Sequence, residues 1–436
     1  MMSKNNTDST CVAGMTDYFP IDMKYRNWLF SLWKQCSENY GFDEYDSSIL
    51  ENTKMYTCKG GDDILSEMYN LNIDNTNLTI RPEMTPTFAR MVLSKIKEEV
   101  MPIKWFSIPS CYRYGDISSG RKRCFYQWNV DIVGGENNKS ELEIFSILVR
   151  FLKKIGLSSN NFEICISNRM ILEKVLRQMN INDEAKILKI FNIIDKLAKL
   201  TENELKNKLK EEGLNDDNIK QIFELTKITE IKDLELLLGK NDETIKEMMS
   251  IFEMAKKMEI DNWLKFDVSI VRGLSYYTGI VFEGYFKNSR IKKAVCGGGR
   301  YDNLLQNYGY KDKINSCGFG MGDLVVILGL EDLDLLPKFQ LEKDYVIIPF
   351  NDDYYVDACK IAEMLRDKNK TVDVYQKRTK IRIAYNYANK KYASYVIYIA
   401  PDEWKDEKII IKDLRTHNLD EKQITINLST FYEKLV

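Results

Sequence analysis

The chain is 436 residues long and 44% hydrophobic, which is enough for two or three domains that each bury a core. Its formal net charge of −2 excludes a global attraction to nucleic acid, so any such binding must come from local basic patches. The single histidine, His417, nearly excludes a histidine-based metal site or catalytic triad. Nine cysteines without a Cys-x-x-Cys pair argue against a zinc ribbon or a disulfide framework and for a reducing compartment.

Neither a membrane span nor a secretory signal is expected. The sequence contains no run of about 18 apolar residues, the length that a spanning helix needs. The N-terminal stretch is short and polar, without the apolar segment of a secretory signal. We therefore expect an intracellular protein of the cytoplasm.

The first predicted elements are a helix and a strand-to-helix corner. Residues 22–40 carry apolar side chains at helical spacing and precede Gly41, a typical helix end, and 42–58 are expected to be extended. Residues 78–92 predict a strand that ends near Glu83 and a helix with Thr85 as N-cap and proline at its first position. Side chains at such a corner are accessible, but Glu83 would also be explained as a carboxylate that favours the helix N-terminus.

A hairpin over residues 103–134 is the most informative stretch. Its first strand delivers Arg113, and its loop, 116–123, holds Gly120 and three cations: Arg121, Lys122 and Arg123. With period 2, one face of its second strand presents Phe125, Gln127, Asn129 and Asp131. A polar row in so aromatic a segment favours a pocket for an anionic ligand beside a small polar one, because buried polar groups need partners. An amphipathic hairpin with a solvated basic turn explains the pattern equally well.

The amino-acid composition changes in the middle of the chain. After a predicted helix (140–155) and strand (161–167), the segment from Arg169 to about residue 260 is rich in Lys, Glu, Leu and Ile at helical spacing, which predicts an inserted helical module. Strand patterns resume at 264, with two strands around Arg272 and Gly273. Two glycine-rich bends follow, at 294–305 and 316–330; neither is a phosphate-binding P-loop, and tight sheet packing explains them as well as ligand binding does.

The C-terminal stretch predicts a separate α/β domain. After Pro337, strand and helix patterns alternate. Residues 374–400 contain six cations and no acid, interleaved with tyrosines, a composition that suits single-stranded nucleic acid. A solvated helix face is the alternative.

Taken together, the motifs resemble the histidyl-tRNA synthetase family, a class II aminoacyl-tRNA synthetase family. The matching segments are DYFP (17–20), RPEMTP (81–86), the hairpin as motif 2, RGLSYYTG (272–279), GGRYD (298–302) and GFGMGD (318–323), which is similar to motif 3. The resemblance implies an α+β fold whose antiparallel-sheet catalytic domain (1–168 and 261–336) carries the helical insertion (169–260). Residues 344–436 are similar to the α/β anticodon-binding domain of class II enzymes.

The resemblance implies ATP-dependent activation of L-histidine and its transfer to tRNA(His) by a homodimer, with Mg²⁺ accompanying ATP and no metal-ligating residues. It implies catalytic roles for Arg113 and Arg272. It implies ATP contacts at Arg113, Arg121, Arg123, Phe125 and Gly320. It implies histidine contacts at Glu83, Thr85, Gln127, Asp131, Arg272, Tyr276 and Tyr277. We expect tRNA contacts at Lys122, Lys377, Arg378, Lys380 and Arg382.

Four positions depart from the family pattern. Gly115 replaces the glutamate of Arg-x-Glu in motif 2, which meets the adenine amino group, and Asp116 is a candidate substitute. Val325 replaces an arginine late in motif 3, Ser275 the aspartate of RGLDYY, and Ser48 a motif 1 proline. The alternative to a working ligase is a catalytically weakened paralogue that senses histidine or tRNA as a regulatory subunit.

Overall fold

The computed structural model describes residues 10–57, 62–197, 200–416 and 423–433. They form two compact units, the first mainly Tyr25–Pro337 and the second mainly Lys338–Val436. His417 lies outside the described residues.

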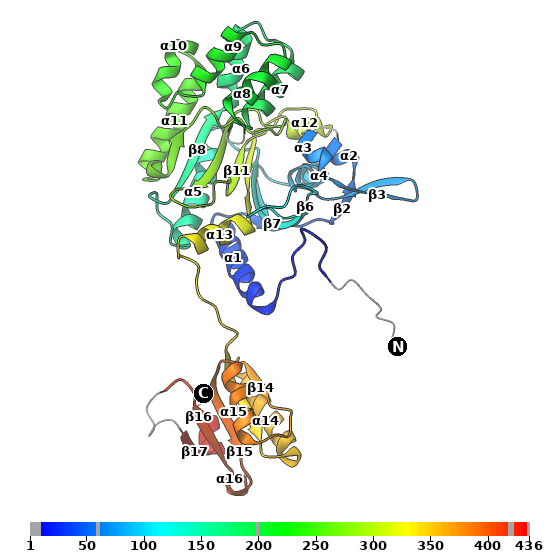
Figure 1. Ribbon diagram of the computed structural model, residues 1–436, viewed down its shortest axis with the longest axis vertical. Coiled ribbons are helices and arrows are strands. Elements are labelled where there is room, and N and C mark those ends of the chain that lie inside the picture. Colours follow the sequence, from blue (N-terminus) through cyan, green and yellow to red (C-terminus); the bar gives the residue numbers. More distant parts are fainter. Residues whose placement is uncertain (1–9, 58–61, 198–199, 417–422, 434–436) are drawn as a thin grey trace. The chain divides into compact units, whose positions relative to one another are not determined.

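A large, mostly antiparallel sheet forms the centre of the first unit (Figure 1). In the part of the chain that the structure describes, its nine strands follow the order β1-β5-β7-β12-β11-β10-β8-β9, with β6 paired to β7. The strands are β1 (Asp43–Glu44), β5 (Ile103–Ser107), β6 (Ser110–Tyr112), β7 (Cys124–Val133), β8 (Phe162–Asn168), β9 (Leu264–Phe266), β10 (Ile280–Phe286), β11 (Cys296–Arg300) and β12 (Ser316–Gly322). The pairs β1–β5 and β8–β9 are parallel. This arrangement confirms the predicted fold class.

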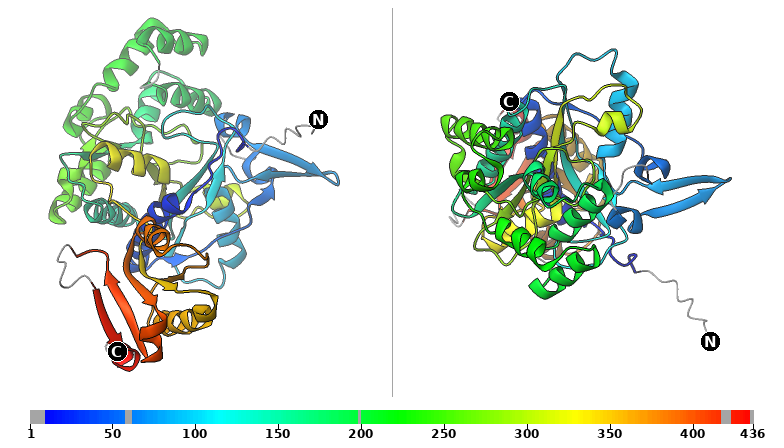
Figure 2. Two further views of the ribbon diagram at one scale, coloured as in Figure 1. Left: turned by 60° about the horizontal axis from the view of Figure 1, so that its bottom comes forward. Right: turned by 90° about the horizontal axis from the view of Figure 1, so that it is seen from above.

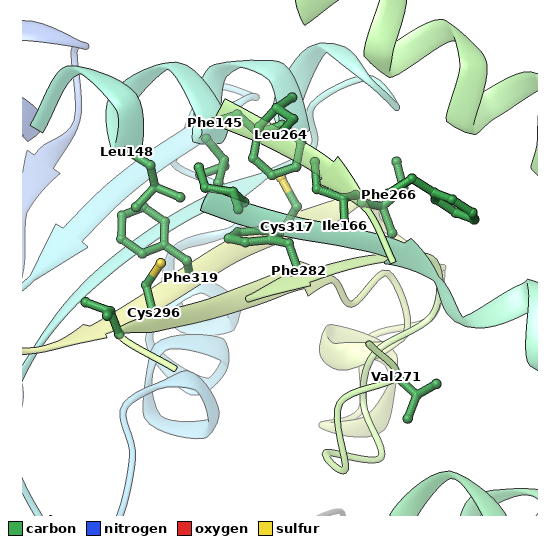
Figure 3. Close-up of a cluster of buried hydrophobic side chains, with 14 of the residues drawn as sticks. Phe145, Leu148, Ile166, Leu264, Phe266, Val271, Phe282, Cys296, Cys317 and Phe319 are labelled. Carbon is green, nitrogen blue, oxygen red and sulfur yellow. The ribbon is translucent and has the colours of Figure 1, made fainter. Parts of the chain in front are cut away.

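Aromatic side chains fill one face of this sheet. They come from the sheet and from α1 (Pro20–Asn39) and α5 (Lys139–Lys154). The ring of Trp128 stacks on Trp33 at 5.8 Å and meets Phe319 edge-on at 5.0 Å. Figure 3 shows Phe145 of α5 above Phe282 of β10, with ring centroids 5.0 Å apart. The opposite face carries the polar row of β7 and a second, smaller hydrophobic cluster that includes Phe88, Tyr276 and Val281.

The glycine-rich stretches, which were predicted to be bends, are strands β11 and β12. The register of β12 with β7 sets Gly318 beside Asp131 and Gly320 beside Asn129. A Cβ atom at Gly320 would overlap the amide of Gln127, and one at Gly318 would overlap the carboxylate of Asp131. Glycine is therefore needed because the neighbouring strand lays its polar side chains across these positions. The result is a floor without side chains, bordered by the polar row of β7.

The segment before α4 also differs from the prediction. Strand β4 (Thr76–Ile80) ends earlier than Glu83, and the N-cap of α4 (Thr85–Lys95) is Met84, not Thr85. Proline at 82 has no N–H for the ladder, and the buried Arg81 side chain donates to the carbonyls of Ser47 and Ser110, each at 2.8 Å. Residues 81–84 therefore bend toward the large sheet instead of continuing strand β4.

Short elements surround this corner. They are β2 (Leu50–Asn52), α2 (Lys54–Thr57), α3 (Asp62–Ser66), β3 (Tyr69–Ile73) and α12 (Leu304–Asn307), with α13 (Asp323–Asp332) after motif 3. Residues 42–58 were predicted to be extended, but α2 is helical. Strands β2, β4 and β3 form a small antiparallel sheet, and the β3–β4 hairpin projects as an arm (Figure 2).

The segment from Arg169 to Trp263 is helical and gathers in one block (Figure 1). It contains α6 (Arg169–Gln178), α7 (Glu184–Ile194), α8 (Glu202–Glu211), α9 (Asp216–Leu225), η1 (Ile231–Leu234), α10 (Glu235–Leu238), α11 (Glu243–Lys257) and η2 (Asp261–Trp263). Side-chain caps define where five of these helices begin: Asn168, Asp183, Thr201, Asn215 and Asp242.

The second unit has a five-stranded sheet in the described residues, in the order β14-β13-β15-β16-β17. Its strands are β13 (Lys343–Pro349), β14 (Val372–Val374), β15 (Ala393–Ile399), β16 (Lys408–Asp413) and β17 (Gln423–Asn427). Its helices are η3 (Asp352–Tyr354), α14 (Tyr355–Asp367), α15 (Ile381–Lys390), α16 (Pro401–Lys405) and α17 (Leu428–Glu433). Strands β14, β13 and β15 are parallel, and β16 and β17 add antiparallel pairs.

Candidate active site

A cavity of about 560 Å³ lies on the glycine floor of the first unit. Ten of the predicted site residues line it, although they come from four separate stretches of the chain. They are Glu83, Thr85, Arg113, Arg121, Gln127, Asp131, Arg272, Tyr276, Tyr277 and Gly320.

Asp131 is the most telling group in this cavity. It is only 3% exposed, and the hydroxyl of Tyr301 donates a hydrogen bond to its Oδ1. Its Oδ2 is buried and has no hydrogen-bond partner among the described residues. Burial raises the pKa of this carboxyl to about 7, and the bond from Tyr301 acts against the rise. A buried acceptor without a partner is costly, so this oxygen is suited to a donor on a ligand.

Glu83 provides a second buried carboxylate. It is 5% exposed, and the hydroxyl of Tyr276 donates to its Oε2 at 3.3 Å. Burial raises the pKa of Glu83, while the positive charges of Arg113 and Arg272 act in the opposite direction. The bend at residues 81–84 is what brings this side chain from the β4–α4 connection into the cavity.

Arg272 is held in an unusual backbone conformation. Its φ of 54° lies in the left-handed region, which is uncommon for residues other than glycine. An ion pair with Glu283 of β10 fixes its guanidinium, and Arg169 donates to the carbonyls of Arg272 and Leu274. Burial acts to lower the pKa of Arg272, but Glu283 and Tyr277 raise it overall. The neighbours thus fix a permanently charged guanidinium at the cavity wall.

A second cavity, of about 240 Å³, adjoins the first. Arg113, Arg121 and Arg272 line both, and Phe125 and Lys122 line only the second. Arg113 donates from Nε to the carbonyl of Pro82 at 2.8 Å and lies 5.5 Å from the centre of the Phe125 ring. Three arginines beside an aromatic face suit a nucleotide, because they offer phosphate contacts and a stacking surface together.

Five predicted residues lie elsewhere. Arg123 lines neither cavity: its guanidinium lies 3.8 Å from the centre of the Tyr114 ring and donates to the carbonyl of Ala13. The other four belong to the second unit, where they are exposed before and within the first turn of α15: Lys377, Arg378, Lys380 and Arg382.

Several cavity residues were not predicted from the sequence. Glu67 follows α3, Glu283 lies on β10, and Asn192, Asp195 and Lys196 come from the end of α7 and the residues after it. No motif marked these positions, because tertiary structure alone brings them to the site. Tyr301 is different, because it is the tyrosine of GGRYD, and that motif was the available signal.

The antiparallel sheet, its paired arginines and the separate α/β unit define the catalytic and anticodon-binding parts of a class II aminoacyl-tRNA synthetase. Comparison with family models agrees: residues 14–323 match "Histidyl-tRNA synthetase" and residues 344–436 match "Anticodon binding domain". The chain belongs to the histidyl-tRNA synthetase family. The resemblance in the sequence motifs is thereby confirmed.

Relatives match nearly the whole chain. It is 36% identical over 402 residues to the chloroplastic/mitochondrial histidine–tRNA ligase of Arabidopsis thaliana, covering 92% of this chain and 82% of the relative. It is 32% identical over 424 residues to the histidine–tRNA ligase of Leptospira biflexa, covering 97% and 96%.

Two solved structures share the fold. The histidyl-tRNA synthetase of Nostoc sp. PCC 7120 aligns with a TM-score of 0.78 at 21% identity, over 98% of this chain and 99% of that one. An ATP phosphoribosyltransferase regulatory subunit/histidyl-tRNA synthetase from Bacillus halodurans aligns with a TM-score of 0.74 at 22% identity, over 91% and 99%. Among the described residues, no helix combines the length and apolarity that crossing a membrane requires.

Proposed function

We propose that the protein is a histidine–tRNA ligase that activates L-histidine with ATP to histidyl-adenylate and transfers it to the 3′ end of tRNA(His). The observation that carries this proposal is the unpartnered Oδ2 of Asp131 in a polar cavity. An acceptor there pairs with one imidazole nitrogen of histidine, and the hydroxyl of Tyr277, which lines the same cavity, pairs with the other.

The remaining site residues receive complementary roles. Glu83, Thr85 and Gln127 hold the ammonium of the amino acid, and Tyr276 positions Glu83 through its hydroxyl. Arg113 and Arg272 stabilise the charge that develops on the α-phosphate when the carboxylate attacks it. Arg121 and Gly320 contact the rest of the triphosphate, and Phe125 carries the adenine. Arg123 remains a prediction, and its contacts with Tyr114 and Ala13 give it no support.

Magnesium accompanies ATP in this proposal. Mg²⁺ in nucleotide sites is held mainly by substrate phosphates and one or two carboxylates, not by a protein cage. The described residues contain no cluster of three His, Cys, Asp or Glu side chains of the kind that would form such a cage. The carboxylate of Glu283 lines the cavity together with the arginines, so the residues present fit ATP-bound Mg²⁺.

We propose that Lys122 contacts the tRNA acceptor end and that Lys377, Arg378, Lys380 and Arg382 contact the anticodon region. The domain limits of 1–168, 169–260, 261–336 and 344–436 are part of the same proposal.

A homodimer is proposed from the family alone, and light scattering would test it. The cytoplasmic location is also a proposal; the Arabidopsis relative is chloroplastic/mitochondrial, so imaging of a tagged full-length chain would test the compartment.

Histidine-dependent ATP–pyrophosphate exchange tests the activity. A working ligase shows robust exchange, and it charges tRNA(His). The rival interpretation is a regulatory paralogue; the Bacillus halodurans structure is named as both an ATP phosphoribosyltransferase regulatory subunit and a histidyl-tRNA synthetase. Absence of exchange with intact tRNA binding would favour that rival and overturn the ligase proposal.

A further inference from the structure

Gly115 leaves a space that the side chain of Glu67 fills. A Cβ atom at Gly115 would lie 2.6 Å from Oε1 of Glu67 and 2.8 Å from Nη2 of Arg121. These two side chains form an ion pair of 2.5 Å directly over the glycine. The carboxylate of Glu67 therefore stands where a longer side chain at position 115 would point, although it comes from a different part of the chain.

The backbone holds Glu67 at this place. The N–H of Tyr114 donates to the carbonyl of Glu67 at 2.7 Å, which ties the end of α3 to the chain just beyond β6. The rings of Tyr69 and Tyr114 meet edge-on at 5.6 Å beside this bond. Glu67 is thus anchored on both sides, and its side chain has a defined direction.

The carboxylate also has capacity for a ligand. The side chain of Glu67 is 20% exposed and lines the large cavity with Arg113 and Arg121. Oε1 bonds to Arg121, and within the described ranges no protein group bonds to Oε2. Asp116, the substitute considered from the sequence, is exposed and lines neither cavity of the site.

The chemistry of a nucleotide limits what this oxygen can bind. A carboxylate only accepts hydrogen bonds and repels phosphate, so it suits a base amino group or a ribose hydroxyl. Arg113 and Arg121 connect the large cavity to the second cavity, where Phe125 offers its ring to a base. Glu67 therefore lies at the boundary between the base and the phosphates.

We propose that Glu67 reads the nucleotide base: its carboxylate accepts a hydrogen bond from the 6-amino group of adenine, and Arg121 together with the space at Gly115 holds it in position. This inference rests on the proposed function. Position 115 has no side chain to accept a hydrogen bond from adenine, and Glu67 supplies this acceptor from another part of the chain.

Inosine triphosphate (ITP) tests the proposal, since it carries a carbonyl oxygen in place of the 6-amino group. We expect the wild-type protein to bind ATP in preference to ITP. Glu67→Gln keeps the size of the side chain but can donate to the carbonyl, so the preference should fall by about tenfold or more. Gly115→Ala should lower it in the same direction by displacing both partners. Calorimetric dissociation constants and pyrophosphate exchange both measure this ratio, which does not depend on the folded fraction.

Glu143→Gln is the matched control. Glu143 lies on α5, pairs with Lys104 and lines neither cavity, so its loss should leave the ATP/ITP ratio unchanged. An equal loss of affinity for both nucleotides in Glu67→Gln would overturn base reading and leave a positioning role for Arg121. A changed preference between ATP and 2′-deoxy-ATP, with the ITP ratio constant, would overturn it in favour of a ribose contact. If exchange fails but the calorimetric ratio shifts as expected, the proposed function falls and this inference stands.

Discussion

At the scale of single residues, Asp131 links recognition to stability. Its folded-state pKa of about 7 lies well above the usual 3.8, because burial penalises the charged form. The folded protein therefore binds this proton more tightly than the unfolded chain does. The free energy of unfolding should decrease as the pH rises from about 4 to about 7, by an amount on the order of a few kcal/mol.

Asp131→Asn tests both sides of this balance. The variant should raise the unfolding temperature at pH 8, where wild-type Asp131 is ionised, and have little effect near pH 4. It should also raise the KM for histidine, because the neutral amide oxygen is a weaker acceptor than a carboxylate for an imidazole N–H. In the wild type this KM should rise as the pH falls below about 7, and pyrophosphate exchange across pH 5.5–8.5 measures it. In the variant, which has no carboxyl at position 131, any change of this KM with pH comes from titration of histidine itself. An identical pH profile in both proteins would contradict the role of Asp131 in binding histidine.

Arg272 is the second residue whose environment predicts a role. Its left-handed φ, its ion pair with Glu283 and the two carbonyls bonded by Arg169 keep a guanidinium fixed before any ligand binds. Arg272→Ala should reduce the exchange rate by about 100-fold or more, the scale for losing one preorganised donor. Arg290→Ala removes an exposed arginine that pairs with Asp332, and serves as the control. Near-normal turnover of Arg272→Ala would contradict a catalytic role.

At the scale of elements, the sequence predicts strands and helices better than the connections that build the site. Period 2 in β7 correctly predicted the polar row, and the helical spacing after Arg169 predicted helices. The glycines of β11 and β12 were predicted to form bends, because the local sequence carries no information about the side chains of a neighbouring strand. The end of β4 was misplaced for a similar reason, since Arg81 bonds to carbonyls distant in sequence.

The site itself was predictable where a motif carried it. One cavity is lined by three polar residues of β7, three arginines and two tyrosines that the motifs contain: Gln127, Asn129, Asp131, Arg113, Arg121, Arg272, Tyr276 and Tyr277. Glu67, Glu283 and the end of α7 were not predictable, because their contribution depends on how separate elements pack. Arg123 shows the opposite limit: the family resemblance implies an ATP contact there, but its guanidinium contacts the ring of Tyr114 and donates to the carbonyl of Ala13.

The glycine floor leads to a prediction for β12. Gly320→Ala should place a Cβ atom against the amide of Gln127 and displace it from the cavity. We expect the KM for histidine to increase by about tenfold or more, since a polar contact is lost in a buried site. Gly322 lies two residues further along the same face of β12, and a Cβ atom added there has no neighbour within 4 Å. The KM of Gly322→Ala for histidine should therefore stay close to that of the wild type. Equal effects of the two substitutions would show that β12 tolerates no side chain for reasons unrelated to Gln127.

At the scale of the whole molecule, the candidate active site and the basic cluster belong to two different units, each with its own core. The cavities of the candidate site are lined by residues of the first unit, and the basic cluster of Lys377, Arg378, Lys380 and Arg382 belongs to the second. Activation of histidine and recognition of tRNA should therefore respond to different substitutions. A ligase needs both activities, whereas a tRNA sensor can dispense with the activation of histidine.

Replacing the four cluster residues with alanine should leave pyrophosphate exchange unchanged and weaken binding of tRNA(His). If all four contact phosphates, the slope of log K against log salt should become shallower by about 3, because each contact to single-stranded nucleic acid contributes roughly 0.7. A filter-binding titration at several salt concentrations measures this slope. Lys360→Ala with Lys405→Ala removes two cations of the same unit that already pair with aspartates, and should change it little. A loss of exchange in the fourfold variant would contradict the division between the units, and an unchanged slope would move the tRNA contact away from α15.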